Sequence, residues 1–333
     1  MFVRTLNRLL ARLDLALVNR SVIYDWQVGE GTSPALANLP PGAEAYLRPD
    51  NPRLVELRER YRAFQAAASI PLVWTDEYVQ SYSLQTFRGD NCYVWQTNDP
   101  NCDEIHYCLT AYYVQALDRL GLLEKNVEDG LFGAHTHAIS GRVVSRDLLD
   151  SIIELTFLDT HLDLFSRPGI TILDIGAGYG RLACRAACSL DNLQAYLCTD
   201  AVPESTFLSE YHTRFRQVDD RVQVVPLDEI EERLRKERID LAVNIHSFSE
   251  CSMDAVNWWL EQVAASRIPH LFIVPNAVDH GGQRLALNSG EDFSHLVERH
   301  GYRLRVREPK FTDPVVQRYG VSPTWYYLFE LAR

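Results

Sequence analysis

A run of closely spaced glycines lies in the second half of the chain. Asp174 is followed by Gly176, Gly178 and Gly180, directly after the apolar run 170–175. Glycine accepts backbone angles and close approaches that a Cβ would forbid, so a chain of this kind can wrap around a ligand. A glycine motif alone is weak evidence. Here, however, the sequence predicts a strand, a turn and a helix in the order that a nucleotide-type site requires.

A second carboxylate strengthens the case for a cofactor with a ribose. Asp200 lies 20 positions after Gly180, at the end of the next predicted strand. A carboxylate at this point can accept hydrogen bonds from both hydroxyls of a ribose. A dinucleotide dehydrogenase would have GxGxxG, whereas here Arg181 and Leu182 follow the last glycine. The spacing instead favours S-adenosylmethionine (SAM) over NAD as the cofactor.

Further residues are predicted to complete the cofactor site. Asp174 is placed to hold the amino-acid end of SAM, directly or through water, and Ala201 and Val202 to pack on the adenine. Asp228 follows the third predicted strand and is a candidate for the adenine amine. A carboxylate that only caps the dipole of the next helix explains Asp228 equally well. The predicted cofactor-binding residues are Asp174, Gly176, Ala177, Gly178, Gly180, Asp200, Ala201, Asp228 and Asn244.

The residues that leave the fourth predicted strand are the candidates for catalysis, because ligands of open α/β sheets lie at the carboxyl ends of the strands. They read NIHSFSE, over 244–250. Methyltransferases that act on DNA amines have two prolines and an aromatic residue here, which this chain lacks. A hydroxyl acceptor needs a general base. An imidazole, with an ordinary pKa of about 6.5, can be that base.

We therefore predict His246 as the catalytic base, with Glu250 orienting it or touching the substrate. The alternative is that His246 is a hydrogen-bonded loop residue and Glu250 a charge at a helix N-terminus. His135 and His137 could also reach the site from the N-terminal half. The sequence has no carboxylate cluster or recognised His/Asp spacing, so no metal is predicted.

Alternating strands and helices must position these residues. From about residue 170 the chain predicts an α/β fold, in which a mostly parallel Rossmann-like sheet closes with an antiparallel hairpin. In this closing hairpin the predicted sheet resembles that of the class I methyltransferases. No helix is expected between the last two strands. The predicted strands cover 170–175, 193–200, 222–227, 240–245, 270–276, 302–308 and 324–331.

The N-terminal half lacks this alternation. We expect two units: a mainly helical cap over 1–142, which binds substrate, and a SAM-binding methyltransferase domain over 143–333. The segments 52–69 and 107–123 are helical candidates. A helix over 145–165, with Ser145 as its N-cap, should enter the second unit.

The overall composition excludes several classes of function. The 333 residues carry a net charge of -12, which argues against a nucleic-acid substrate. Seven cysteines without a CxxC pair favour a reduced, cytoplasmic protein. No apolar run approaches the ~20 residues of a membrane span. The spacing of leucines over 1–20 predicts an amphipathic helix that docks on the protein itself, with binding to a membrane surface or a partner as the alternative. A small-molecule substrate is therefore expected.

Four stretches together resemble the sugar O-methyltransferases of bacterial polysaccharide and natural-product pathways. This resemblance implies SAM-dependent methylation of a sugar or glycoside hydroxyl, with Asp174, Gly176, Gly178 and Asp200 at the cofactor. Cys251 stands where members of the family often have Met. A methyltransferase acting on N or O of another small metabolite, or a non-catalytic SAM-binding subunit, are the alternatives. The stretches are EDGLFG (128–133), SRDLLDSIIE (145–154), ILDIGAGYGRLA (172–183) and NIHSFSE (244–250).

Overall fold

The computed structural model describes residues 38–89 and 104–332, together with Leu10, Leu13 and Leu17. The amphipathic helix expected over 1–20 falls almost entirely outside these residues and stays a prediction. Within the described residues, no helix is both long and apolar enough to cross a membrane.

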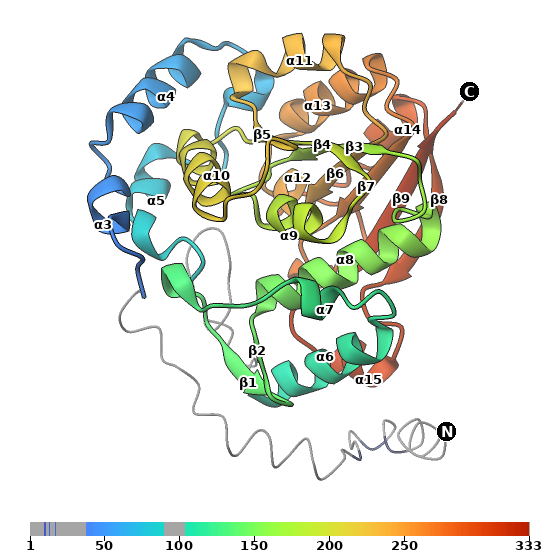
Figure 1. Ribbon diagram of the computed structural model, residues 1–333. Helices are drawn as coiled ribbons and strands as arrows, with labels where there is room; N and C mark the ends of the chain where they lie inside the picture. Colours follow the sequence, from blue (N-terminus) through green and yellow to red (C-terminus); the bar gives the residue numbers. More distant parts are fainter. Residues whose placement is uncertain (1–9, 11–12, 14–16, 18–37, 90–103, 333) are drawn as a thin grey trace.

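A seven-stranded sheet forms the centre of the described residues, in the order β5-β4-β3-β6-β7-β9-β8 (Figure 1). The first five strands in this order pair in parallel, and β9 pairs antiparallel with both β7 and β8. The expected fold class is confirmed. The strands are β3 (Ile170–Ile175), β4 (Leu193–Thr199), β5 (Val222–Val224), β6 (Leu241–Ile245), β7 (His270–Val274), β8 (Tyr302–Pro309) and β9 (Trp325–Leu331).

One expectation about the closing hairpin was wrong. A short helix, α15 (Pro314–Tyr319), lies between β8 and β9. The Asp313 side chain accepts hydrogen bonds from the backbone N–H groups of Val315 and Val316, and Pro314 occupies the first turn. An Asp cap followed by Pro is a helix-start signal, and it begins a helix in a segment where none was expected.

Helices cover both faces of the sheet. In Figure 1, α8 (green) lies on one side, and α10 and α13 (yellow to orange) lie on the other. The expected N-cap of α8 is confirmed, because the Ser145 side chain accepts a hydrogen bond from the backbone N–H of Leu148. The helices of this part are α8 (Arg146–Leu162), α9 (Arg181–Ser189), α10 (Pro203–Phe215), α11 (Ile230–Lys236), α12 (Ser247–Glu250), α13 (Met253–Ala265) and α14 (Ser294–Arg299).

The described N-terminal region is mainly helical, as expected, but it also contains a hairpin of β1 (His137–Ile139) and β2 (Arg142–Val144). Its helices are α3 (Ala43–Tyr46), α4 (Pro52–Ala63), α5 (Asp76–Gln80), α6 (Glu104–Leu117) and α7 (Leu122–Lys125), with 3₁₀ turns at Ala67–Ser69, Leu84–Thr86 and Leu131–Gly133.

Both hydrophobic cores combine N-terminal residues with the sheet. Leu173 of β3 belongs to the same buried cluster as Leu57 of α4. Its neighbour Ile172 faces the other side and belongs to a cluster with Tyr107 of α6. Successive residues of a strand point to opposite faces, so β3 contributes to both cores. The division into units at residue 142 stays a prediction.

Candidate functional site

A cavity of about 440 Å³ lies at the carboxyl ends of β3, β4 and β6. Residues 58–79 of the N-terminal region form part of its wall. Of the residues predicted from sequence, the cavity brings together Asp174, Gly176, Ala177, Gly178, Asp200, Ala201, His246 and Glu250. Gly180, Asp228 and Asn244 are not among the described residues that line it.

The glycine loop adopts backbone angles that explain its composition. Gly176, Gly178 and Gly180 have φ angles of 74°, 56° and 77°. A Cβ on Gly176 would lie 2.3 Å from both Cβ and Oγ of Ser247, in the turn after β6. The loop and this turn therefore pack in direct contact, which only glycine permits at position 176.

The carboxylate of Asp200 holds the loop in shape. Its Oδ2 accepts a hydrogen bond from the backbone N–H of Gly178 at 2.9 Å, and its Oδ1 accepts one from that of Val202 at 2.8 Å. Burial raises the pKa of Asp200 to about 6. Each carboxylate oxygen has two lone pairs, so Asp200 can still accept hydrogen bonds from a ligand in the cavity.

Asp174 lies at the end of β3 and is nearly inaccessible to solvent. The Tyr196 hydroxyl donates a hydrogen bond to its Oδ2 at 2.9 Å. Burial raises the pKa of Asp174 to about 7, because removal from water penalises the charged form. A cationic ligand group beside Asp174 would lower that pKa again and favour the carboxylate.

The other three predicted cofactor residues have structural contacts. The Asn244 amide donates to the carbonyl of Ile175 at 2.9 Å, and its oxygen accepts the backbone N–H of Phe248 at 2.9 Å. It thereby joins the ends of β3 and β6. Gly180 begins α9. The carboxylate of Asp228 accepts hydrogen bonds from Arg60 at 2.9 and 2.8 Å. The cofactor roles proposed for these residues stay predictions.

His246 has a strained backbone. Its φ and ψ are 69° and -33°, a combination that is rare for residues other than glycine. Such strain costs about 1–3 kcal/mol and clusters at functional sites. Its Nδ1 is buried and has no hydrogen-bond partner among the described residues. Burial, with a smaller contribution from the charge of Arg146, lowers the pKa of His246 to about 3, so the imidazole is neutral at pH 7.

Glu250 forms a polar group with residues from two other elements. The indole N–H of Trp74 donates to its Oε2 at 2.7 Å, and the Asn276 amide donates to its Oε1 at 3.1 Å. Burial raises the pKa of Glu250. All three residues line the cavity. The cavity also has apolar lining residues. Ile70 and Leu72 line it and are 65% and 55% exposed.

Sequence reasoning did not assign several of these residues to the site. Asn276 follows β7, so the rule that ligands lie at strand ends could have identified it. Trp74 comes from the N-terminal region, and no local pattern indicates its contact with Glu250. Lys310 is buried and donates to Asp150 Oδ1 at 2.6 Å, although its neighbours in sequence give no sign of this pair. Asp150 in turn lines the cavity.

His135 and His137 are not among the described residues at the cavity. Both pack against Tyr107, with ring centroids 6.1 and 4.1 Å away. Burial lowers the pKa of His137 to about 4. Within the described part of the chain, no group of three or more His, Cys, Asp or Glu side chains is arranged to hold a metal ion.

No family model matches the sequence, and no curated protein matches it. Solved structures similar to the chain include a SAM-dependent methyltransferase from Aquifex aeolicus, at 16% identity over 55% of this chain and 98% of that chain, with a TM-score of 0.39. A SAM-dependent methyltransferase from Clostridium acetobutylicum has 11% identity over 55% and 91%, with a TM-score of 0.40. The [4+2]-cyclase SpnF has 15% identity over 68% and 95%, also with a TM-score of 0.40. These likenesses are distant, so the function must be inferred from the cavity itself.

Proposed function

We propose that this chain is a SAM-dependent methyltransferase. The observation that carries the proposal is a single cavity that contains Asp174, the glycine loop and Asp200. The cavity lies at the ends of β3 and β6, between which the strand order reverses: β4 and β5 follow on one side of β3, and β6 and β7 on the other. Open α/β sheets bind their ligands at this switch point. A cavity of about 440 Å³ is also within the usual range for cofactor sites.

The charge of the cavity supports SAM rather than NAD. Among the described lining residues, seven are Asp or Glu and four are Arg. A cation beside Asp174, Asp200 and Glu250 would favour their ionised forms, whereas the pyrophosphate of a dinucleotide would disfavour them. When bound, SAM supplies a methyl group on a positively charged sulfonium. The residues present therefore fit this cofactor.

We further infer a hydroxyl acceptor, with His246 as the group that takes its proton. A pKa of about 3 makes His246 a weak base. However, a hydroxyl oxygen becomes far more acidic than an imidazolium as its bond to the methyl carbon forms. A neutral imidazole within reach of the acceptor is then sufficient, and His246 is one of the residues that line the cavity.

Trp74, Glu250 and Asn276 support a sugar or glycoside as the acceptor. Carboxylate and amide groups hydrogen-bond to hydroxyls, and an aromatic face packs on the apolar face of a sugar ring. Ile70 and Leu72, which are exposed at the same cavity, instead favour an apolar alcohol or phenol as the second candidate.

Calorimetry followed by an acceptor panel tests the proposal. We expect binding of SAM and S-adenosylhomocysteine and none of NAD; preference for NAD would overturn the cofactor assignment. Transfer of labelled methyl from SAM is then measured with glycosides, apolar alcohols, phenols and amines. Transfer only to phenols or amines would reject the sugar, and binding without transfer to any acceptor would favour a non-catalytic subunit.

One variant separates the acceptor end of the cavity from the cofactor end. Glu250→Gln should raise KM for a glycoside about tenfold and leave the Kd of S-adenosylhomocysteine unchanged within about twofold. Glu261→Gln, on the exposed side of α13, is the matched control. An equal effect of the two substitutions on KM would reject the contact between Glu250 and substrate.

A further inference from the structure

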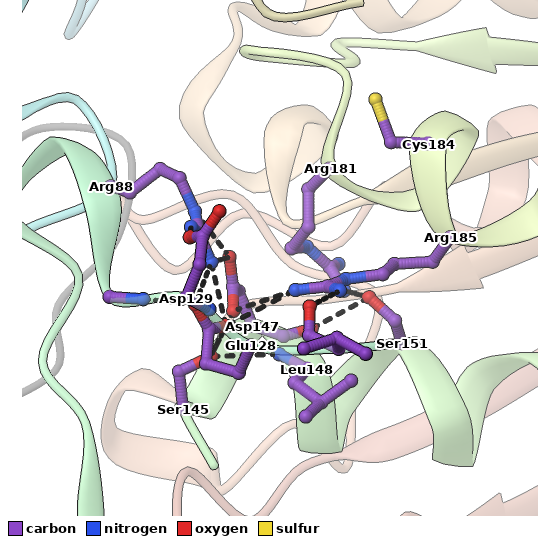
Figure 2. A network of polar contacts seen from close by, with 12 residues as sticks. Arg88, Glu128, Asp129, Ser145, Asp147, Leu148, Ser151, Arg181, Cys184 and Arg185 are labelled. Carbon is purple, nitrogen blue, oxygen red and sulfur yellow. Dashed lines mark hydrogen bonds and ion pairs between the residues drawn. The ribbon is translucent and has the colours of Figure 1, made fainter. Parts of the chain in front are cut away.

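Arg88 is the centre of a buried ionic network (Figure 2). The side chain is 1% exposed, and its guanidinium donates to Glu128 at 2.7 and 2.9 Å and to Asp147 Oδ2 at 2.8 Å. It also donates to Asp129 at 3.1 Å. Ser145, the N-cap of α8, donates to Glu128 Oε2 at 2.5 Å. Residues far apart in sequence thus meet at one guanidinium.

The charges of the network balance. Arg185 of α9 contacts Glu128 at 3.1 Å, and Arg216 pairs with Asp129. Among the described residues of the network, three arginines therefore face three carboxylates. Burial of each charge is costly, and a buried ion pair is weak evidence for a gain in stability. Figure 2 shows that the network also joins Arg88 to Asp147 at the start of α8 and to the side chain of Arg185 in α9, the helix that follows the glycine loop.

Tyr179 connects the network to the glycine loop. It lies between Gly178 and Gly180, and its hydroxyl donates to Asp147 Oδ2 at 2.8 Å, the oxygen that also accepts from Arg88. The ring of Tyr179 lies 5.2 Å from that of Phe87, the residue before Arg88. Tyr179 and Asp147 both line the cavity.

We propose that Arg88 and Asp147 are positioning residues for the cofactor loop and act through the hydroxyl of Tyr179. Asp147 fixes the Tyr179 side chain, and Arg88 fixes Asp147. Because glycines flank Tyr179 on both sides, the loop has little intrinsic stiffness, and this anchor fixes its shape together with the hydrogen bond from Gly178 to Asp200. The inference rests on the proposed function, since it assigns the loop to SAM.

Tyr179→Phe tests the anchor, because it removes only the hydroxyl and keeps the ring. We expect the Kd of S-adenosylhomocysteine to rise about tenfold, equivalent to about 1.4 kcal/mol, while kcat at saturating SAM changes less than KM. Tyr302→Phe is the matched control: its hydroxyl donates to the carbonyl of Ile268 at 2.7 Å, in a buried position that does not line the cavity. It should lower the melting temperature without changing Kd.

Arg88→Lys tests whether the anchor depends on the guanidinium. It should also raise Kd, and its combination with Tyr179→Phe should weaken binding by less than the product of the two single effects. If Tyr179→Phe binds as tightly as the wild type, the inference is overturned, even if Arg88→Lys does not fold. Independent effects of the two substitutions would overturn the role of Arg88. Failure of the wild type to bind the ligand would instead reject the proposed function.

Discussion

Gly176→Ala gives the sharpest test of the site geometry. Two separate costs are expected. Gly176 has a φ of 74°, and an L-residue in the left-handed region costs about 1–2 kcal/mol. The new Cβ would also lie 2.3 Å from Ser247, far closer than the 3.0 Å below which real Cβ contacts essentially never occur. Overpacking of this kind costs about 1–3 kcal/mol. The free energy of unfolding should therefore fall by about 2–5 kcal/mol.

Gly141→Ala separates the two costs. Gly141 has a φ of 75°, almost identical to that of Gly176, but a Cβ there would have no neighbour within 4 Å. The free energy of unfolding of Gly141→Ala should therefore fall only by the cost of the left-handed backbone conformation, about 1–2 kcal/mol. Urea unfolding at 25 °C of both variants gives the difference, expected at about 1–3 kcal/mol. Calorimetry should also show weaker binding of S-adenosylhomocysteine to Gly176→Ala alone.

Removal of the Ser247 side chain should relieve its overlap with the new methyl group of Gly176→Ala. Adding Ser247→Gly to Gly176→Ala deletes the Cβ and Oγ that the new methyl group meets. The double variant should recover most of the excess destabilisation relative to the Ser247→Gly single variant. Equal stability losses for Gly176→Ala and Gly141→Ala, or no recovery in the double variant, would refute the close approach of the glycine loop and the turn after β6.

Three further predictions concern buried titratable groups. Burial raises the pKa of Asp174 to about 7, so the native state holds a proton that the unfolded chain releases near pH 4. The free energy of unfolding of the wild type should therefore fall by ~1–4 kcal/mol relative to that of Asp174→Asn as the pH rises from 4 to 7. A difference between the two proteins that does not change with pH in chemical unfolding would contradict this. Lys310→Met should lower the free energy of unfolding by about 3–5 kcal/mol, because it leaves the buried carboxylate of Asp150 with only the longer contact to Arg146 at 3.4 Å among the described cations paired with it. Adding Asp150→Asn should restore part of this loss in the same unfolding assay. His246→Ala should lower kcat about 100-fold while the Kd of S-adenosylhomocysteine stays unchanged, and the wild-type rate should show no titration from His246 near pH 6.5, since its pKa lies at about 3. Unchanged turnover would reject His246 as the base.

Local rules of the chain predicted much of the fold. The apolar run 170–175 is β3 without a shift of either boundary, and Ser145 caps α8 as its residue type suggests. These features depend on residues close in sequence, through steric limits and hydrogen bonds between near neighbours. The same kind of rule, Asp followed by Pro, was available for α15, although no helix was expected there.

The candidate site also has one part that depends on residues close in sequence and another that depends on distant ones. The sequence by itself determined the glycine loop, Asp174 and Asp200, because their spacing is set within two consecutive strands, β3 and β4, and the turn and helix between them. Only the tertiary structure brought Trp74 to Glu250, 176 positions away, and Arg88 to Asp147, 59 positions away. Burial and ion pairing depend on which surfaces the sheet topology brings together. No local pattern encodes them, so the contact of Trp74 with Glu250 and that of Arg88 with Asp147 became visible only in three dimensions.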